Sequence, residues 1–189
     1  MHVKDGAQVV AIDDAPHRRD DATTGLAFVF CQGDRLEHFF QATIHVDGMD
    51  ATRTILDALR PRRALFRLVL THGITVGGLN VIDIEEIHRV LESPVIAVTE
   101  NEPIPGSLQA AATHVKQAGK RIKVIDEAGP VHAIATRPGE TPVYVHLKGI
   151  DINAATRFLK VQAVRSRLPE CLLLAHKIST GLQGATSRP

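Results

Sequence analysis

Two adjacent carboxylates end a stretch near the start of the chain that has the pattern of a buried strand. In VVAIDDAPHRRDD, residues 9–21, apolar residues lead directly into Asp13 and Asp14. A second acidic pair, Asp47 and Asp50, lies in the stretch VDGMD. Converging carboxylates repel one another unless a cation lies between them, and Mg²⁺ prefers oxygen ligands of this kind. Such an ion can activate water and stabilise charge on a phosphate oxygen.

The same acids have a simpler structural explanation. Aspartates before a proline commonly bond to backbone amides in turns, and Asp50 precedes a helical pattern that it could cap. Successive residues of a strand also point to opposite faces, so only one of Asp13 and Asp14 can easily reach a shared site. Spacing alone therefore leaves both the metal site and the turn open.

The elements that must position these residues follow from the spacing of apolar residues. We expect strands at residues 8–13, 26–31, 36–46, 64–73, 94–100 and 143–149, with another near residues 121–126. We expect helices at residues 47–61, 83–93, about 106–117, about 151–165 and from about residue 169 onward. Asp50 and Asp83 are the expected N-caps of the first two helices, and Pro61 is expected to end the first.

The order of these elements predicts the fold class. Three early strands with short connections are expected to be antiparallel neighbours, whereas strands separated by helices are expected to pair in parallel. The result is an α/β fold: a ribonuclease-H-like mixed five-stranded sheet with helices on both faces and extra C-terminal strands and helices. In such a sheet the first and fourth strands are neighbours, so Asp13 should lie beside the THG stretch at residues 71–73.

Composition restricts the class of protein. The 189 residues favour one domain, and no apolar run reaches the ~18 residues of a membrane span. The N-terminal stretch MHVKDGAQ lacks the apolar segment of an export signal. A formal charge of +1 gives no strong global attraction to nucleic acid, although a local patch can bind it. Cys31 and Cys171 are expected to be reduced thiols, so the sequence predicts a cytoplasmic protein that does not bind membranes.

Five blocks occur in an order that resembles a known family. They are AIDDAP, VDGMDATRTI, GITVGGLNVIDI, PVIAVTENEP and PECLLLAHKISTG, and they cover roughly residues 8–187. Together they resemble the mainly archaeal endonuclease dU family, a relative of endonuclease V. The resemblance implies a single endonuclease-V-like domain over residues 1–189 with the ribonuclease-H-like fold. It also implies metal-dependent cleavage of DNA that contains deoxyuridine.

The resemblance implies roles for individual residues. Asp13 matches the metal-binding aspartate that ends the first strand of endonuclease V, and Asp14 is the extra acid of the IDDA block. Endonuclease V takes its second acid, a glutamate, from roughly the part of the sheet that holds Asp47 and Asp50, so either can be its counterpart. The AHKISTG block resembles a late GHRIS segment whose histidine helps at the metal site, which makes His176 a candidate.

The chain departs from the family pattern at His72, where relatives commonly have Asp before Gly. Imidazole is a poor ligand for Mg²⁺, so this residue favours Mn²⁺ or a softer metal, one ion instead of two, or loss of catalysis. Gln32 stands in place of an expected arginine, and so does Leu173, which removes two possible phosphate contacts. The expected cofactor is Mg²⁺ or Mn²⁺, with no organic cofactor.

Two groups of residues are candidates for contacts with nucleic acid. Arg18 and Arg19 follow the acidic pair and could bind phosphate, or they could be ordinary solvated surface. The GITVGGLN stretch could hold phosphate through backbone amides near Gly77, Gly78 and Asn80. Its alternative role is a tight connection that needs glycine at positive φ.

The leading hypothesis is a metal-dependent endonuclease-like protein that acts on DNA with a deaminated base such as deoxyuridine, in DNA repair. Asp13, Asp47 or Asp50, and His72 would be its metal ligands, with His176 as proton shuttle or supporting group. The first alternative is a catalytically impaired nucleic-acid-binding protein of the same fold. The second is a small-ligand role in the same cleft. Cleavage of damaged DNA that depends on Asp13 would separate these hypotheses.

Overall fold

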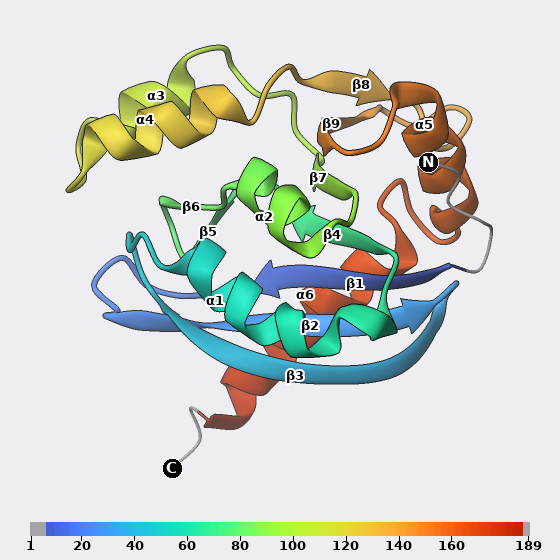
Figure 1. Cartoon of the computed structure of the whole chain (residues 1–189), viewed down its shortest axis with the longest axis horizontal. Helices are drawn as coiled ribbons and strands as arrows, with labels where there is room; N and C mark the ends of the chain where they lie inside the picture. Colours follow the sequence, from blue (N-terminus) through green and yellow to red (C-terminus); the bar gives the residue numbers. More distant parts are fainter. Residues whose placement is uncertain (1–6, 187–189) are drawn as a thin grey trace.

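One mixed sheet of seven strands organises the molecule (Figure 1). The computed structural model describes residues 7–186, with side chains through residue 181. The strand order is β3-β2-β1-β4-β7-β9-β8. The strands are β1 (Gln8–Asp14), β2 (Thr23–Gln32), β3 (Arg35–His45), β4 (Leu68–His72), β7 (Val95–Thr99), β8 (His132–Ile134) and β9 (Val143–Lys148). A separate small hairpin pairs β5 (Thr75–Val76) with β6 (Asn80–Val81).

The pairing directions confirm the predicted ribonuclease-H-like topology. β2 is antiparallel to both β1 and β3, whereas β4 is parallel to both β1 and β7. The hairpin of β8 and β9 extends this five-stranded unit, because β9 pairs antiparallel with β7. The single-domain assignment over residues 1–189 stays a prediction.

Helices cover both faces of the sheet, as Figure 1 shows. Helices α1 (Ala51–Leu59) and α2 (Ile84–Leu91) lie on one face, and α6 (Glu170–Thr186) packs against β1 and β2 from the other. Helix α5 (Ile152–Gln162) belongs to the α6 face through its buried apolar residues. Helices α3 (Ser107–Ala112) and α4 (Ala118–Glu127) contribute to the core on the α1 face.

Strand β1 is buried on both sides, which explains its uninterrupted apolar run. Val9 and Ala11 belong to the core beneath α6, whereas Val10 and Ile12 belong to the core beneath α1 and α2. The same alternation continues past the core. It therefore directs Asp13 to the α6 face.

Several predicted elements differ from the structure. The helix expected at about residues 106–117 is the shorter α3, and the strand expected at residues 26–31 is longer at both ends. Residues 121–126 form part of helix α4, not a strand. The spacing of their apolar residues fits both the two-residue repeat of a strand and the 3.6-residue repeat of a helix. Arg121 and Ile125, which lie one helical turn apart, are both buried, so the helical repeat is the one that the structure follows. The strand expected at residues 64–73 begins only at Leu68, because the 3₁₀ helix η1 (Arg60–Leu65) continues the chain after α1. Pro61 lies in the first turn of η1, where its missing amide proton costs nothing.

The two predicted helix caps have different outcomes. Asp83 caps α2 as expected, since its Oδ1 accepts a hydrogen bond from the Glu86 amide at 2.8 Å. Asp50 occupies the N-cap position of α1 but makes no cap bond with its side chain. Instead, the Ala51 amide donates to Oδ1 of Asn80 at 3.0 Å.

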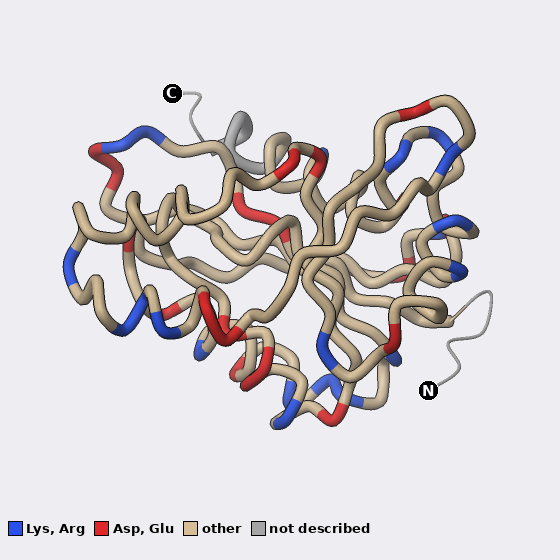
Figure 2. Tube along the Cα trace, turned by 90° about the horizontal axis from the view of Figure 1, so that it is seen from above, with Lys and Arg blue, Asp and Glu red and all other residues tan. Residues whose placement is uncertain are grey.

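Cys31 and Cys171 are both free and buried, as the sequence predicts. In the view of Figure 2, the Lys and Arg of the described residues are spread around the outside of the trace and are interspersed with acids. Within the described part of the chain, no helix combines the length and apolar character that crossing a membrane requires.

Candidate metal centre and adjoining cleft

Asp13 and His72 meet because β1 and β4 are parallel neighbours. Their register pairs Ile12 with Thr71, so the next residues along each strand lie side by side. Leu70 belongs to the core beneath α6, and alternation along β4 therefore sends His72 to the same face as Asp13. His72 Nδ1 lies 3.3 Å from Oδ1 of Asp13, whose carboxylate is almost completely buried.

Helix α6 supplies a third group to this face. His176 Nδ1 lies 2.9 Å from Oδ2 of Asp13, so each oxygen of the carboxylate contacts one imidazole. The ligand atoms of Asp13, His72 and His176 all lie within 4.8 Å of one another, and these residues form the group that could hold a metal ion in the described part of the chain. The hydrogen bond with Asp13 raises the pKa of His72, although burial of the imidazole opposes the shift.

Asp14 points to the opposite face. Its Oδ2 accepts a hydrogen bond from the Gly77 amide at 2.9 Å and lies 3.5 Å from Nδ1 of His17. Burial raises the pKa of the Asp14 carboxyl, and the bond from Gly77 partly offsets the shift. Asp14 thus links the end of β1 to the glycine-rich bend, the GITVGGLN stretch at residues 73–80.

Asp47 lies in a strained turn on the α1 side of the sheet. Its φ is 51°, its amide donates to the Gly77 carbonyl at 2.8 Å, and its Oδ1 accepts from the Leu79 amide at 2.8 Å. Gly77 therefore bonds to both Asp14 and Asp47. The carboxylate of Asp47 is engaged in the turn, outside the group formed by Asp13 and the two histidines.

Asp50 is also engaged away from that group. Its Oδ2 lies 2.7 Å from Nδ1 of His45, and its Oδ1 accepts from Nδ2 of Asn80 at 2.6 Å. Although burial acts to raise the pKa of Asp50, the hydrogen bonds with His45 and Asn80 lower it. The predicted convergence of Asp47 or Asp50 with Asp13 is not seen, because these acids precede α1 on the other face of the sheet. Their role as metal ligands stays a prediction without support from the geometry.

The glycine-rich bend is held by internal hydrogen bonds. The amides of Gly77 and Leu79 donate to Asp14 and Asp47, and Gly77 and Gly78 have φ values of 53° and 78°. The predicted third member of the bend, Asn80, is completely buried. These contacts favour the tight-connection alternative over a phosphate cradle.

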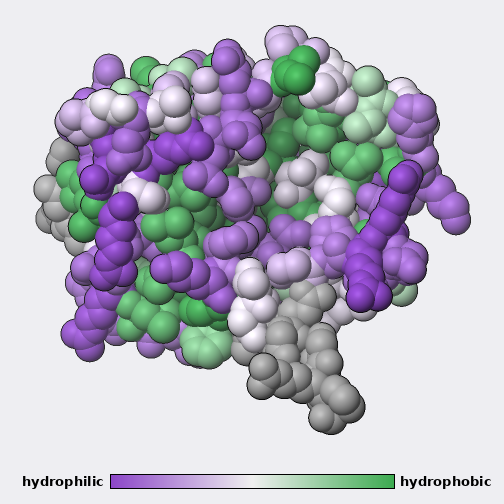
Figure 3. Space-filling view, turned by 180° about the vertical axis from the view of Figure 1, so that it is seen from behind, coloured by the Kyte–Doolittle hydropathy of each residue, from purple (hydrophilic) through white to green (hydrophobic). Residues whose placement is uncertain are grey.

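Two hollows meet at His72. An open cleft of about 380 Å³ is lined by Asp13, Asp14, Ala15, Pro16, His17, His72 and His176. A second pocket, of about 540 Å³, is lined by His72 and by residues of the segments after β4 and β7, together with Tyr144 and His146 of β9. Figure 3 shows the face that carries α6, which is hollowed, with apolar surface inside the hollow and hydrophilic side chains around it.

The family model for endonuclease dU matches residues 5–183. The chain belongs to the endonuclease dU family. A UPF0215 protein of Methanosarcina acetivorans is 33% identical over 190 aligned residues, which cover 100% of this chain and 96% of the relative.

Solved structures share the fold of this chain. A protein of unknown function from Archaeoglobus fulgidus has a TM-score of 0.83 and 25% identity, covering 93% of this chain and 98% of that protein. Endonuclease V of Ciona intestinalis, in complex with DNA that contains an inosine, has a TM-score of 0.66 and 13% identity. The match covers 96% of this chain and 87% of that one. This likeness shows that the endonuclease dU protein shares the fold of endonuclease V.

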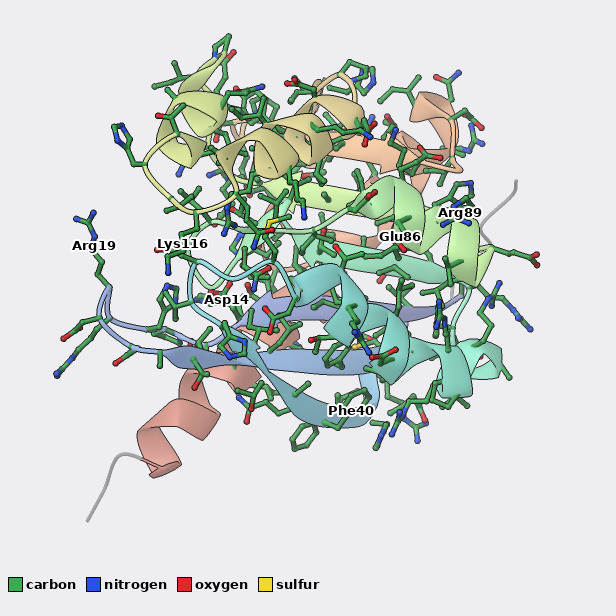
Figure 4. All side chains as sticks on the ribbon, turned by 60° about the vertical axis from the view of Figure 1, so that its left-hand side comes forward. Asp14, Arg19, Phe40, Glu86, Arg89 and Lys116 are labelled. Carbon is green, nitrogen blue, oxygen red and sulfur yellow. The ribbon has the colours of Figure 1, made fainter. Side chains whose placement is uncertain are left out.

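The two predicted arginines lie in the loop that joins β1 to β2, beside the cleft of this endonuclease dU protein. Arg18 donates its amide to Oδ2 of Asp21 at 2.7 Å within a turn, and both arginine side chains are exposed. Figure 4 shows Arg19 at the tip of the loop, pointing into solvent and away from Asp14. The two cations therefore flank the site without entering it.

One residue of the cleft, and one buried cation next to the glycine-rich bend, were missed from the sequence. His17 lines the cleft beside Asp14 and could have been noticed in the DDAPHRRDD stretch. Arg121 is completely buried, and its guanidinium donates to the backbone carbonyls of Lys116, Gly48, Leu79 and Asp47. The expectation of a strand at residues 121–126 concealed this role.

We expect Gly78→Ala to destabilise the fold by about 2–4 kcal/mol. A Cβ at this position would lie 2.5 Å from Oδ1 of Asp47, in addition to the cost of a φ of 78°. Gly139→Ala is the matched control, since Gly139 has a φ of 76° but no atom within 4 Å of an added Cβ. Urea unfolding of both variants would measure the contact with Asp47 as the difference between them, and equal destabilisation would contradict the expectation.

Proposed function

We propose that this protein is a metal-dependent endonuclease of DNA repair, acting in the cytoplasm on DNA with a deaminated base such as deoxyuridine. The observation that carries the proposal is the convergence of Asp13, His72 and His176 at an open cleft where the parallel strands β1 and β4 end. Membership of the endonuclease dU family supports it. The DNA complex of endonuclease V supports nucleic acid as the partner.

The donor set suits a divalent cation. Asp13 would hold the ion with its buried carboxylate. His72 and His176 each contact one oxygen of that carboxylate with a ring nitrogen, so both imidazoles lie close to the same position. Of the two expected ions, Mn²⁺ accepts imidazole ligands more readily than Mg²⁺. A bound ion would supply an activated water and stabilise charge on a phosphate oxygen.

The larger pocket would receive the altered base. Enzymes that recognise a damaged base extrude it from the stack into a closely fitting site, and about 540 Å³ is within the usual range for a small-ligand pocket. Asn101, Glu102 and Tyr144 line this pocket, and Tyr144 donates its hydroxyl to Oε2 of Glu102 at 3.3 Å. These polar groups could read the hydrogen-bonding edge of the base. Arg18 and Arg19 would contact the phosphates next to it.

The second proposal is a catalytically impaired protein that still binds nucleic acid. His72 favours it, because an imidazole stands where relatives of endonuclease V commonly carry an acid. The fold, the cleft and the flanking arginines would then serve binding alone.

The two proposals differ in one assay. Purified protein is incubated with labelled duplex and single-stranded DNA that contains uracil, inosine or no altered base, with Mn²⁺ or Mg²⁺. We expect cutting next to uracil with Mn²⁺ and much less cutting of unmodified DNA. Binding without cutting would support the second proposal, and equal cutting of all the DNAs would rule out recognition of a deaminated base.

A further inference from the structure

The ligand set of this site is rich in nitrogen. Two of the three groups that converge are imidazoles, and the single carboxylate, Asp13, contacts one imidazole with each of its oxygens. The two rings meet edge to face with centroids 6.0 Å apart. Three separate elements, β1, β4 and α6, therefore present their donor atoms to one small volume.

The three other acids of the AIDDAP and VDGMD stretches, Asp14, Asp47 and Asp50, are bonded to other groups and add no oxygen to this set. Oδ2 of Asp14 accepts from the Gly77 amide, and Oδ1 of Asp47 accepts from the Leu79 amide. Both oxygens of Asp50 are bonded to other residues. None of the three acids belongs to the cluster found among the described residues. Asp13 is therefore the one carboxylate of the cluster, and its other two donors are nitrogen, which Mg²⁺ accepts poorly.

Ligand chemistry distinguishes the ions that such a set would hold. Mg²⁺ demands oxygen donors in near-octahedral geometry, whereas imidazole suits Zn²⁺, Co²⁺ and related ions. Two imidazoles with one carboxylate leave further positions for water or substrate, as in catalytic zinc sites and in non-haem iron sites. The same set without an ion would be a hydrogen-bonded His-Asp-His cluster.

We propose that Asp13, His72 and His176 form a site for one divalent transition-metal ion of the imidazole-binding class, in preference to Mg²⁺. The proposal deepens the proposed function, on whose site it rests, by naming the class of ion and by making His176 a ligand. It requires only small movements, because the donor atoms already lie within 4.8 Å of one another. His176 is free to make such a movement, since its side chain is 57% exposed.

The test uses tag-free, metal-stripped protein and the visible absorption of Co²⁺, which reports binding and the coordination geometry of the ion without any need for catalysis. We expect one equivalent of Co²⁺ to bind, Zn²⁺ to displace it, and an excess of about 100-fold Mg²⁺ to leave it in place. His72→Ala and His176→Ala should each weaken Co²⁺ binding by at least about 10-fold. His114→Ala, which changes an exposed histidine away from the cleft, should bind Co²⁺ as the wild type does.

His72→Asp is the decisive variant, because it replaces one nitrogen donor by oxygen at the same place. It should lose affinity for Co²⁺ and gain affinity for Mg²⁺, measured by competition and by isothermal titration. The proposal is overturned if Mg²⁺ displaces Co²⁺ at equal concentration, or if His72→Ala and His176→Ala bind Co²⁺ as the control does.

The outcomes also separate this proposal from the proposed function. Co²⁺ binding with the expected preferences, together with no cutting of uracil-containing DNA, would sustain the metal site and overturn the nuclease. Cutting that needs Mg²⁺ and is unaffected by His72→Ala would sustain the nuclease and overturn the ion class. Circular dichroism of each variant would show that it is folded.

Discussion

Under the proposed function, replacing Asp13 by Asn should abolish cleavage of uracil-containing DNA, with a loss of at least about 100-fold in rate. Asp13 is the one carboxylate in the cluster, and both of its oxygens contact an imidazole. The amide of Asn has the same shape but no negative charge, and it replaces one acceptor oxygen by a donor nitrogen. The substitution therefore removes the charge that would hold a cation while it leaves the packing of β1 in place. Single-turnover cleavage measures the effect.

The control for this variant is Asp34→Asn, which changes an exposed acid in the turn between β2 and β3. Asp34→Asn should cut at the wild-type rate and unfold at the wild-type temperature. Asp13→Asn should remain folded but fail to bind the metal ion. If Asp13→Asn cuts DNA as fast as Asp34→Asn, Asp13 does not hold the catalytic ion.

Replacing Arg121 by Met will destabilise the fold by about 3 kcal/mol or more. The guanidinium is completely buried and is balanced by backbone carbonyls from three segments, near residues 47–48, 79 and 116. Burial of the guanidinium lowers the pKa of Arg121, and the nearby charge of Asp47 opposes the shift. Methionine fills much of the same volume but leaves all these acceptors without a donor, and each such group costs about 1–3 kcal/mol. Urea unfolding measures the loss.

Two companions make the Arg121 prediction specific. Lys120→Met removes the exposed neighbouring cation and should change the free energy of unfolding by less than about 0.5 kcal/mol. Arg121→Lys keeps a charge with fewer donors and should fall between the wild type and Arg121→Met. Equal stability of Arg121→Met and Lys120→Met would show that the carbonyls need no buried donor.

The topology could be predicted from the sequence because it depends on local signals. The uninterrupted apolar run of β1 and the crossover helix α2 between β4 and β7 indicate which strands are neighbours. That order was sufficient to place Asp13 beside His72. His176 lies 163 residues from Asp13 along the chain, and only the resemblance of its block to endonuclease V indicated it.

The rest depended on tertiary contacts that spacing does not reveal. Asp47 and Asp50 both follow β3, which ends at the same end of the sheet as β1. They nevertheless lead into α1, which lies on the face of the sheet opposite His176. The helix at residues 118–127 was missed because its apolar residues also fit a strand, and burial of Arg121 against a distant turn decided the outcome. Such long-range hydrogen bonds override local preference.

The most direct test of the account is anomalous diffraction from crystals soaked in Mn²⁺ or Zn²⁺. We predict one strong peak at about 2.0–2.2 Å from an oxygen of Asp13 and from a nitrogen of both His72 and His176. The peak should disappear in Asp13→Asn. A peak bound by Asp47 or Asp50 instead, or no peak at the end of β1, would contradict the central claim that these three side chains gather around one ion.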